Sequence, residues 1–391
     1  MHIKSWVRMK NPFIITGRIP EEYFCDRRLE TQKIIRGLTN GENICLMSPR
    51  RMGKSKLIQF CYDRVELKEE YYTFYIDILH TSSLAEFTYV FGQKVFDTLR
   101  SRNEKMLLAF IQGLKSLNAK FGFDAGSNMP TFSIELGDIV RPEYTLNEIF
   151  TCLEMADKPC IVAFDEFQQI CKYPEKNIEA LLRSHIQHLS NVNFVFAGSE
   201  RHLITEMFLS SAKPFYNSTK QIELYPIAPE EYIPFVTHWF HAYQKEISED
   251  DVRKVYQLFE GNTYGMQRTF HEAFINTSTG ESCSLDIIRK SIADIIEDNG
   301  HAYSRMLSQI PARQKELLYA IAKEGKAEKI TSGAFIKKHV LLSASSVQAA
   351  MKKLLELDLI TLDNGCYTIP DHFLALYLRK LVGMDDGVKI T

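Results

Sequence analysis

The sequence lacks the marks of a secreted or membrane-embedded protein. Its first residues contain no apolar signal-peptide core, and no stretch approaches the roughly 18 uncharged apolar residues of a membrane-spanning helix. The eight cysteines are scattered without a C-x-x-C pair, which argues against a zinc site and favours reduced, mostly buried thiols. These absences predict a cytoplasmic protein with no membrane partner.

A strong net charge is also lacking. The 47 basic and 49 acidic residues leave a formal charge of −2, so any nucleic-acid contact must come from a local basic patch rather than from a global field. The chain has no internal repeat and no low-complexity tract. Its 391 residues are enough for about two or three globular domains.

What the sequence does contain is a phosphate-loop motif. The apolar run 44–47 precedes a glycine-lysine-serine turn, and a helical pattern continues from Lys56. Strand, turn and helix in this order are typical of a P-loop, because backbone N–H groups and the helix dipole then favour an anion at the turn. Lys54 would reach the β- and γ-phosphates, and the hydroxyl of Ser55 would bind Mg²⁺. The predicted nucleotide-binding residues of this motif are Ser48, Pro49, Arg50, Arg51, Met52, Gly53, Lys54, Ser55 and Lys56.

The loop itself has two unusual features. Ser48 stands where the motif has its first glycine, and serine is small enough for the turn although it adopts positive φ less readily than glycine. Arg50 and Arg51 lie inside the loop, where they could add charge near a phosphate, contact a neighbouring subunit or point into solvent. The sequence leaves these alternatives open.

Apolar runs alternate with helical patterns over the first 228 residues. The predicted strands are 43–48, 72–79, 160–166, 193–199 and 221–227. The predicted helices are 27–38, 54–66, 84–118, 145–156 and 175–190, with Thr145 as the N-cap of the fourth. The segment 119–142 is predicted to be a short β-excursion or a loop. This alternation predicts an α/β fold, a parallel sheet with helices on both faces.

Polar residues end two of the predicted strands. Asp165 and Glu166 follow a continuous apolar run, at the edge where a parallel sheet carries its chemistry. A P-loop ATPase needs one acid there to hold Mg²⁺ and another to take a proton from the attacking water, and Asp165 and Glu166 suit these two roles. Ser199 ends the next strand, where it could orient the water or contact the γ-phosphate. It could equally cap the helix that begins near Glu200, and both roles could hold.

After residue 228 the strand signal stops and the pattern becomes helical to about 300, with a break at 260–262. Helices are then predicted at 311–323, 331–338 and 344–357. Two short β-rich runs, 359–362 and 366–369, flank an Asp-Asn-Gly turn, a strong hairpin signal. Three helices followed by a hairpin predict a winged helix-turn-helix.

The third of these helices is the predicted recognition helix. It carries Lys352 and Lys353, and near its start lie Ser343, Ser345, Ser346 and Gln348. Serine and glutamine side chains can contact phosphates and base edges, but the positive charge of this region is weak for a DNA-binding domain. Binding of double-stranded DNA and contact with a protein partner therefore both remain open.

With these residues assembled, the chain resembles the archaeal-type AAA+ ATPases, and in layout it is similar to the signal-transduction ATPases with numerous domains and to archaeal origin-recognition ATPases. The resemblance covers nearly the whole chain. It depends on Asn11-Pro12-Phe13, Phe24-Cys25-Asp26-Arg27 with Glu30, Ser48-Pro49-Arg50-Arg51-Met52-Gly53-Lys54-Ser55, Phe164-Asp165-Glu166, Gly198-Ser199 and Pro214-Phe215-Tyr216.

The resemblance implies a P-loop NTPase sheet of order 5-1-4-3-2, a helical lid and a C-terminal winged helix. It also implies that Arg27 and the nearby backbone frame the adenine side of the nucleotide. We expect a core with its N-terminal arm over 1–228, a lid over 229–305 and a winged helix over 306–391.

These observations predict an ATP-binding and ATP-hydrolysing molecular switch that depends on Mg²⁺. Lys54, Glu166 and Ser199 are the predicted catalytic residues, and Ser55 and Asp165 are the predicted metal ligands. ATP and ADP are the expected ligands, hydrolysis is expected to be slow or partner-dependent, and a nucleotide-dependent homo-oligomer is a further expectation. The alternative is a nucleotide-bound adaptor that binds DNA or protein with little turnover.

Overall fold

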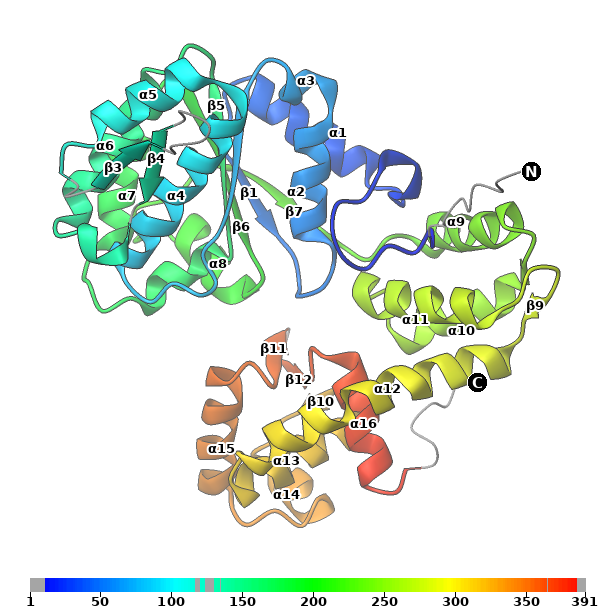
Figure 1. Cartoon of the computed structure of the whole chain (residues 1–391). Coiled ribbons are helices and arrows are strands. Elements are labelled where there is room, and N and C mark those ends of the chain that lie inside the picture. The colour runs from blue at the N-terminus through cyan, green and yellow to red at the C-terminus, as the bar shows by residue number, and fades with distance from the viewer. Residues whose placement is uncertain (1–10, 117–119, 124–129, 134, 364, 385–391) are drawn as a thin grey trace, which may run out of the picture. The chain divides into compact units, whose positions relative to one another are not determined.

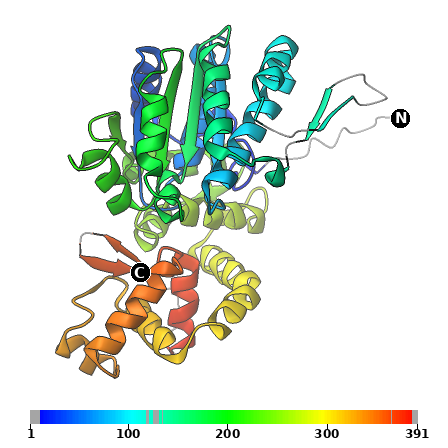
Figure 2. The same cartoon turned by 90° about the vertical axis from the view of Figure 1, so that its left-hand side faces the viewer.

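A computed structural model describes residues 11–116, 120–123, 130–133, 135–363 and 365–384 (Figures 1 and 2). The chain divides into two compact units. We call Arg27–Tyr225 the sheet unit. The helical unit joins the segment that ends at Asp26 to the chain from Pro226 onward. Each unit has its own hydrophobic core and is described separately.

The sheet unit is built on a five-stranded sheet in which every neighbouring pair is parallel. Its strands are β1 (Ile44–Met47), β2 (Tyr72–Asp77), β5 (Cys160–Asp165), β6 (Val192–Gly198) and β7 (Lys220–Glu223). Their order across the sheet is β2-β5-β6-β1-β7. Numbered along the chain, this is 5-1-4-3-2, so the predicted α/β fold and its strand order are confirmed.

Helices cover the sheet because its inner strands β1 and β5 are almost entirely apolar, with Asp165 at the end of β5 as the exception. All residues of β1 and β5 are buried, as expected for parallel strands that are covered on both faces. Figure 2 shows helices on both sides of the sheet. They are α1 (Arg28–Thr39), α2 (Lys54–Asp63), α3 (Val65–Lys68), α4 (Leu84–Arg102), α5 (Glu104–Gly113), α6 (Pro142–Glu154), α7 (Ile178–Ile186) and α8 (Arg201–Leu209). Two short 3-10 helices, η2 (Leu136–Asp138) and η3 (Phe167–Lys172), complete the unit.

Two predicted helices of this unit differ from the structure. The pattern over 84–118 is two helices, because Asn103 ends α4 and its side chain accepts a hydrogen bond from the N–H of Met106 as the N-cap of α5. The prediction that Thr145 is an N-cap is wrong. The helix begins at Pro142, whose fixed φ suits the first helical position.

The segment predicted as a short β-excursion does contain two strands. β3 (Lys120–Phe123) and β4 (Pro130–Ser133) pair antiparallel. Residues 119, 124–129 and 134 of the predicted segment lie outside the described residues, as do residues 117 and 118 at the end of the predicted helix 84–118.

The first half of the helical unit is the predicted lid. It contains α9 (Pro229–Ala242), α10 (Glu249–Leu258), α11 (Thr263–Asn276) and α12 (Leu285–Ser308). The predicted break falls between α10 and α11, where Gly261 has a φ of 72° and Asn262 caps α11. The expectation that strands stop after residue 228 is wrong, because β8 (Glu246–Ile247) and β9 (Ser282–Cys283) pair in parallel. Two residues are too few to produce a strand pattern.

The N-terminal segment packs into the helical unit and not into the sheet unit, where the sequence analysis had placed it. The ring of Phe13 is fully buried against four rings, those of Phe235, Phe240, Phe270 and Phe274. This segment also contains η1 (Glu21–Tyr23). The reason is long-range packing, which the pattern around residue 13 does not reveal. The division into three domains otherwise stays a prediction.

The second half of the helical unit is a winged helix. It contains α13 (Ala312–Glu324), β10 (Ala327–Glu328), α14 (Gly333–Lys338), α15 (Ala344–Glu356), β11 (Thr361–Asp363), β12 (Cys366–Thr368) and α16 (His372–Leu381). β11 and β12 form the predicted antiparallel hairpin, although Asn364 of its turn lies outside the described residues. The fold class, with its lid and winged helix, is therefore confirmed.

The last helix, α16, was not predicted. Leu374 and Leu378 lie in the core of the winged helix, whereas Phe373 and Leu376 lie in the core of the lid. Figure 1 shows α16 beside α12, which it contacts. This helix therefore joins the two cores of the helical unit. Nowhere in the described chain is there a helix with the length and apolar character needed to cross a bilayer.

Candidate active site

The phosphate loop connects the end of β1 to the start of α2. Gly53 is the N-cap of α2 with a φ of 86°, a left-handed conformation that glycine adopts without strain. No side chain caps this helix, so its first N–H groups are directed at the loop, as anion binding requires. Ser48 is fully buried, and its backbone N–H donates to the carbonyl of Gly198 on β6.

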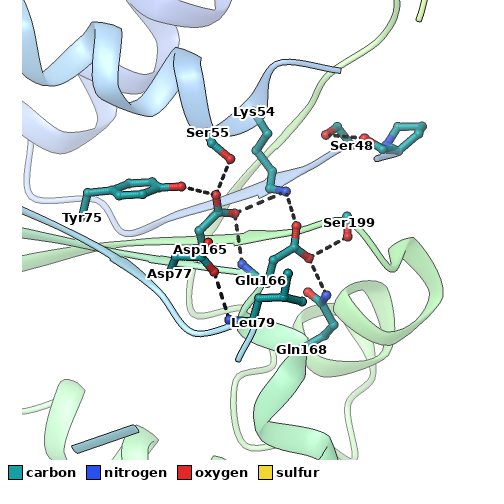
Figure 3. Close-up of polar contacts among 11 residues, drawn as sticks. Ser48, Lys54, Ser55, Tyr75, Asp77, Leu79, Asp165, Glu166, Gln168 and Ser199 are labelled. Atoms are coloured by element: carbon teal, nitrogen blue, oxygen red, sulfur yellow. Dashed lines mark hydrogen bonds and ion pairs between the residues drawn. The ribbon is translucent and has the colours of Figure 1, made fainter. Parts of the chain in front are cut away.

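Lys54 lies between the two acids that end β5. Its Nζ is 3.3 Å from Oδ1 of Asp165 and 3.2 Å from Oε1 of Glu166, and Figure 3 shows its side chain reaching between them. Lys54 lies more than a hundred positions before the two acids in the chain, and the fold brings them together at the carboxyl edge of the sheet. The predicted catalytic lysine and both predicted acids therefore form one cluster.

Asp165 is held by two hydroxyl groups in addition to Lys54. Ser55 Oγ and Tyr75 Oη both donate to its Oδ2, each at 2.5 Å. Burial by itself raises the pKa of Asp165, but the charge of Lys54 and the two hydroxyl donors outweigh it, so the pKa is lowered. Burial and the negative charge of Asp165 raise the pKa of Tyr75, which keeps this hydroxyl protonated as a donor.

Glu166 is held from both sides. Ser199 Oγ donates to its Oε2 at 2.6 Å and Gln168 Nε2 donates to the same oxygen at 2.7 Å, whereas Lys54 binds Oε1. Burial raises the pKa of Glu166, but Lys54, Ser199 and Gln168 together lower it. Glu166 has a φ of 57°, an uncommon conformation for a residue with a side chain and one that is often found at functional sites.

The start of α8 tests the alternative role of Ser199 as an N-cap. The N-cap of α8 is Glu200, and no side chain provides a cap hydrogen bond there. The alternative role of Ser199 as the N-cap is therefore wrong. Ser199 is 8% exposed, and its hydroxyl donates to Glu166 at the end of the neighbouring strand.

Arg27 is buried against the phosphate loop. Its guanidinium donates to the carbonyl oxygens of Met52 at 3.2 Å and Tyr225 at 2.7 Å, and it pairs with Glu30 at 2.9 Å. Arg27 itself has a φ of 64°. It thereby connects the phosphate loop to the last residue of the sheet unit.

The other predicted nucleotide-binding residues follow the course of the loop. Pro49 and Arg51 are exposed, Arg50 and Lys56 are half-buried, and Met52 is 5% exposed. Arg51 has a φ of 66°. Lys56 lies in the first turn of α2. These positions leave the alternatives for the loop arginines open.

The oxygen atoms of Ser55 and Asp165 suit a magnesium ion. Mg²⁺ prefers hydroxyl and carboxylate oxygens, and at nucleotide sites it uses one or two carboxylates together with phosphate oxygens. In the ranges that the structure describes, no group of three or more His, Cys, Asp or Glu side chains could hold a metal. A magnesium ion at Ser55 and Asp165 would take its other oxygen ligands from nucleotide phosphates and water.

Two residues of this cluster were missed by the sequence analysis. Tyr75 lies near the carboxyl end of β2, whose Asp77 pairs in register with Asp165, so its place at the active edge could have been inferred once the strand order was assumed. Gln168 follows Glu166 by two residues. No sequence pattern indicates that its side chain folds back onto the acid.

Comparison with known families gives two matches that together span most of the chain. Residues 24–268 match the family described as "ATPase domain predominantly from Archaea". Residues 301–380 match the family described as "probable winged helix domain". No curated protein matches the chain in sequence.

Among solved structures, the chain is similar to a Walker-type ATPase of Pyrococcus abyssi, with a TM-score of 0.64 and 18% identity over 94% of this chain and 99% of the other. It is also similar to the ORC2 protein of Aeropyrum pernix in its ADPNP-ADP complexes, with a TM-score of 0.58 and 14% identity over 95% and 96% of the two chains. The ORC1 protein of Aeropyrum pernix in complex with DNA has a TM-score of 0.50 and 11% identity over 91% and 93%.

Proposed function

The chain belongs to the family of ATPase domains found predominantly in Archaea, and from this premise we propose that the protein is a molecular switch driven by ATP binding and hydrolysis. The observation that carries this is the position of Lys54, whose ammonium is shared by Asp165 and Glu166. The same lysine is the group that a P-loop uses to hold phosphates. A nucleotide would therefore compete with the two acids for it.

We assign the chemistry of hydrolysis to this cluster. Lys54 and the loop N–H groups hold the phosphates, Ser55 and Asp165 hold Mg²⁺, Glu166 accepts a proton from the attacking water, and Ser199 contacts the γ-phosphate or the water. When bound, Mg²⁺ neutralises charge on the β- and γ-phosphate oxygens. Positioning and charge stabilisation then account for most of the catalysis.

Release of Lys54 makes Glu166 available as a base. In the structure described here, Oε1 of Glu166 is paired with Lys54 and Oε2 accepts two hydrogen bonds. A base in this state has no unpaired oxygen directed at a water molecule. Transfer of Lys54 to a phosphate frees Oε1, so that binding of the substrate itself activates the base.

Arg27 supports the switch part of the proposal. One guanidinium binds Met52 in the phosphate loop and Tyr225, after which the chain leaves the sheet unit. A change in the loop conformation on nucleotide binding would therefore be transmitted through Arg27 to Tyr225, the residue that precedes the helical unit. Two states of this connection, one favoured by ATP and one by ADP, are what a nucleotide switch needs.

The proposal also concerns which partner the switch binds, and it has an alternative in which the protein is a nucleotide-bound adaptor. Winged helices and the DNA-bound ORC1 structure support α15 as a contact to double-stranded DNA. The site supports turnover more than a structural nucleotide, because Lys54, Asp165 and Glu166 are all present and in contact. A protein partner and a nucleotide-dependent homo-oligomer would act through this same switch.

Steady-state phosphate release from Mg²⁺-ATP tests the assignment, measured for wild type and Glu166→Gln with and without double-stranded DNA. We expect Glu166→Gln to lose release while it still binds ATP, because the amide cannot accept the proton. Stimulation of the wild type by DNA would place the winged helix on nucleic acid. Equal phosphate release by both proteins would contradict the role of Glu166. Partner binding that is independent of nucleotide in both proteins would favour the adaptor alternative.

A further inference from the structure

Gln168 is a buried glutamine whose side chain, among the described residues, donates its one hydrogen bond to the proposed catalytic base. It lies in η3, two residues after Glu166, and its side chain is fully buried. Its Nε2 is 2.7 Å from Oε2 of Glu166. Figure 3 shows the amide beneath the carboxylate, next to Ser199. The left-handed backbone of Glu166 turns the chain so that residue 168 can reach back to it.

The orientation of this amide follows from chemistry. An ionised carboxylate only accepts hydrogen bonds, so the group facing Glu166 must be the NH₂ of Gln168 and not its carbonyl. The carbonyl oxygen Oε1 is then buried without a partner among the described residues. A buried unpaired acceptor destabilises a fold, so the feature of this side chain that points to a role is its hydrogen bond to Glu166 and not a gain in stability.

The neighbouring strand leaves room for this amide. A Cβ atom at Gly198 would lie 2.5 Å from Oε1 of Gln168 and 2.3 Å from a side-chain carbon of Ile204. Any larger residue at 198 would push the glutamine off Glu166 or displace α8. We therefore attribute the glycine at 198 to the space that Gln168 needs beside the proposed base, and not to a special backbone conformation.

We propose that Gln168 is a positioning residue for ATP hydrolysis, which together with Ser199 holds Oε2 of Glu166 so that Oε1 is presented to the attacking water. This rests on the proposed role of Glu166 as the base. In that reaction the water oxygen bonds to the γ-phosphorus, its proton passes to Oε1 and the bond to the β-phosphate oxygen breaks, which releases ADP and phosphate. Without Gln168, the carboxylate is held on Oε2 by Ser199 alone and can rotate away from the water.

Gln168→Met tests this role, because methionine keeps the length of the side chain and removes both the donor and the unpaired carbonyl. We expect kcat for phosphate release to fall about 10- to 100-fold, the range that small misplacements of catalytic groups produce. The KM for ATP and the affinity for ADP should stay unchanged, because the side-chain hydrogen bond of Gln168 goes to Glu166 and not to the phosphate loop. The melting temperature should stay equal to that of the wild type or rise.

The adjacent glutamine supplies a matched control. Gln169 donates through Nε2 to the carbonyl of Thr81 at 2.9 Å and does not bind Glu166. Gln169→Met removes a hydrogen bond from the same short helix, so it should lower the melting temperature and leave kcat unchanged. Gly198→Ala should reproduce the loss of kcat seen in Gln168→Met, and the two changes combined should cost little more than either alone.

The outcomes separate this inference from the proposal on which it depends. If Glu166→Gln abolishes release and Gln168→Met does not reduce it, the role of Gln168 is wrong and that of Glu166 stands. If Glu166→Gln itself keeps wild-type release, both fail. A variant that unfolds is replaced by Gln168→Leu, and if both variants unfold, the glutamine serves the fold and the inference is overturned.

Discussion

The ion pairs of Lys54 in the sheet unit differ in kind from many ion pairs of the helical unit. In the sheet unit, Lys54 pairs with Asp165 and Glu166 across more than a hundred residues of sequence, and the Lys54 and Asp165 side chains are 6% and 3% exposed. In the helical unit, many pairs join residues three or four positions apart on the surface of one helix. Examples are Lys254–Asp250, Arg289–Asp286, Arg313–Glu316 and Lys353–Glu356.

The difference separates charge used for chemistry from charge used for solubility. Exposed pairs on one helix contribute only about 0.3–0.5 kcal/mol and are screened by salt. Buried charges need partners at considerable cost and gather where a protein binds or transforms a ligand. The buried cluster therefore supports the assignment of the active edge of the sheet, whereas the Lys353–Glu356 pair partly neutralises α15, the helix predicted to contact DNA.

The largest effect is expected where one member of the buried cluster is removed. Lys54→Ala leaves Asp165 and Glu166 close together without their shared cation, so the nucleotide-free protein should lose about 3 kcal/mol of unfolding free energy and its affinity for ATP. Urea unfolding without nucleotide and titration with a fluorescent ATP analogue measure the two losses. Lys54→Arg, which keeps the charge, should retain more stability than Lys54→Ala, and an unchanged unfolding midpoint in Lys54→Ala would mean that the pairing is not coupled to folding.

An intermediate effect is expected from acid. The pKa values of Asp165 and Glu166 are both lowered in the folded protein. Their contribution to stability is therefore complete above the ordinary values of 3.8 and 4.5 and is lost as the pH falls through the lowered folded values. Unfolding free energies at pH 6, 4 and 3 should fall more steeply for wild type than for the double variant Asp165→Asn, Glu166→Gln. Parallel pH profiles would show that these acids gain nothing on folding.

The smallest effect is expected on the surface of α15. Lys353→Ala removes the exposed partner of Glu356, which lies 2.6 Å away, and should leave the thermal midpoint unchanged at physiological salt because such pairs are screened. Calorimetry of wild type and variant measures this. A clear loss of thermal stability would contradict the distinction between the buried ion pairs of Lys54 and the exposed pairs on helix surfaces.

Most of the fold was predictable because its signals are local. Continuous apolar runs and turn residues marked the strands β1, β2, β5 and β6, and the Asn-Gly pair marked the hairpin of the winged helix. The elements that were missed or misplaced depend on packing instead. β8 and β9 have two residues each, α16 shares its faces between two cores, and Phe13 joins a cluster of rings from distant helices.

The site residues likewise divide into those that sequence motifs predict and those that only the structure reveals. Lys54, Ser55, Asp165, Glu166 and Ser199 were predicted from their motifs and strand ends, and the structure brings them into contact. Tyr75 and Gln168 belong to no motif, and their roles depend on which strands are neighbours and on how the chain turns after Glu166. Hydrogen bonds between side chains are set by three-dimensional positions, which short patterns do not encode.

The sequence by itself determined the phosphate loop, the acids at the end of β5 and the parallel α/β architecture, because each depends on the order and polarity of neighbouring residues. Tertiary structure alone decided that Lys54 is shared by both acids, that Gln168 holds the proposed base and that Gly198 makes room for it. The physical reason is that a parallel sheet collects the ends of strands far apart in the chain at one edge. Only there do burial and charge act on these side chains together.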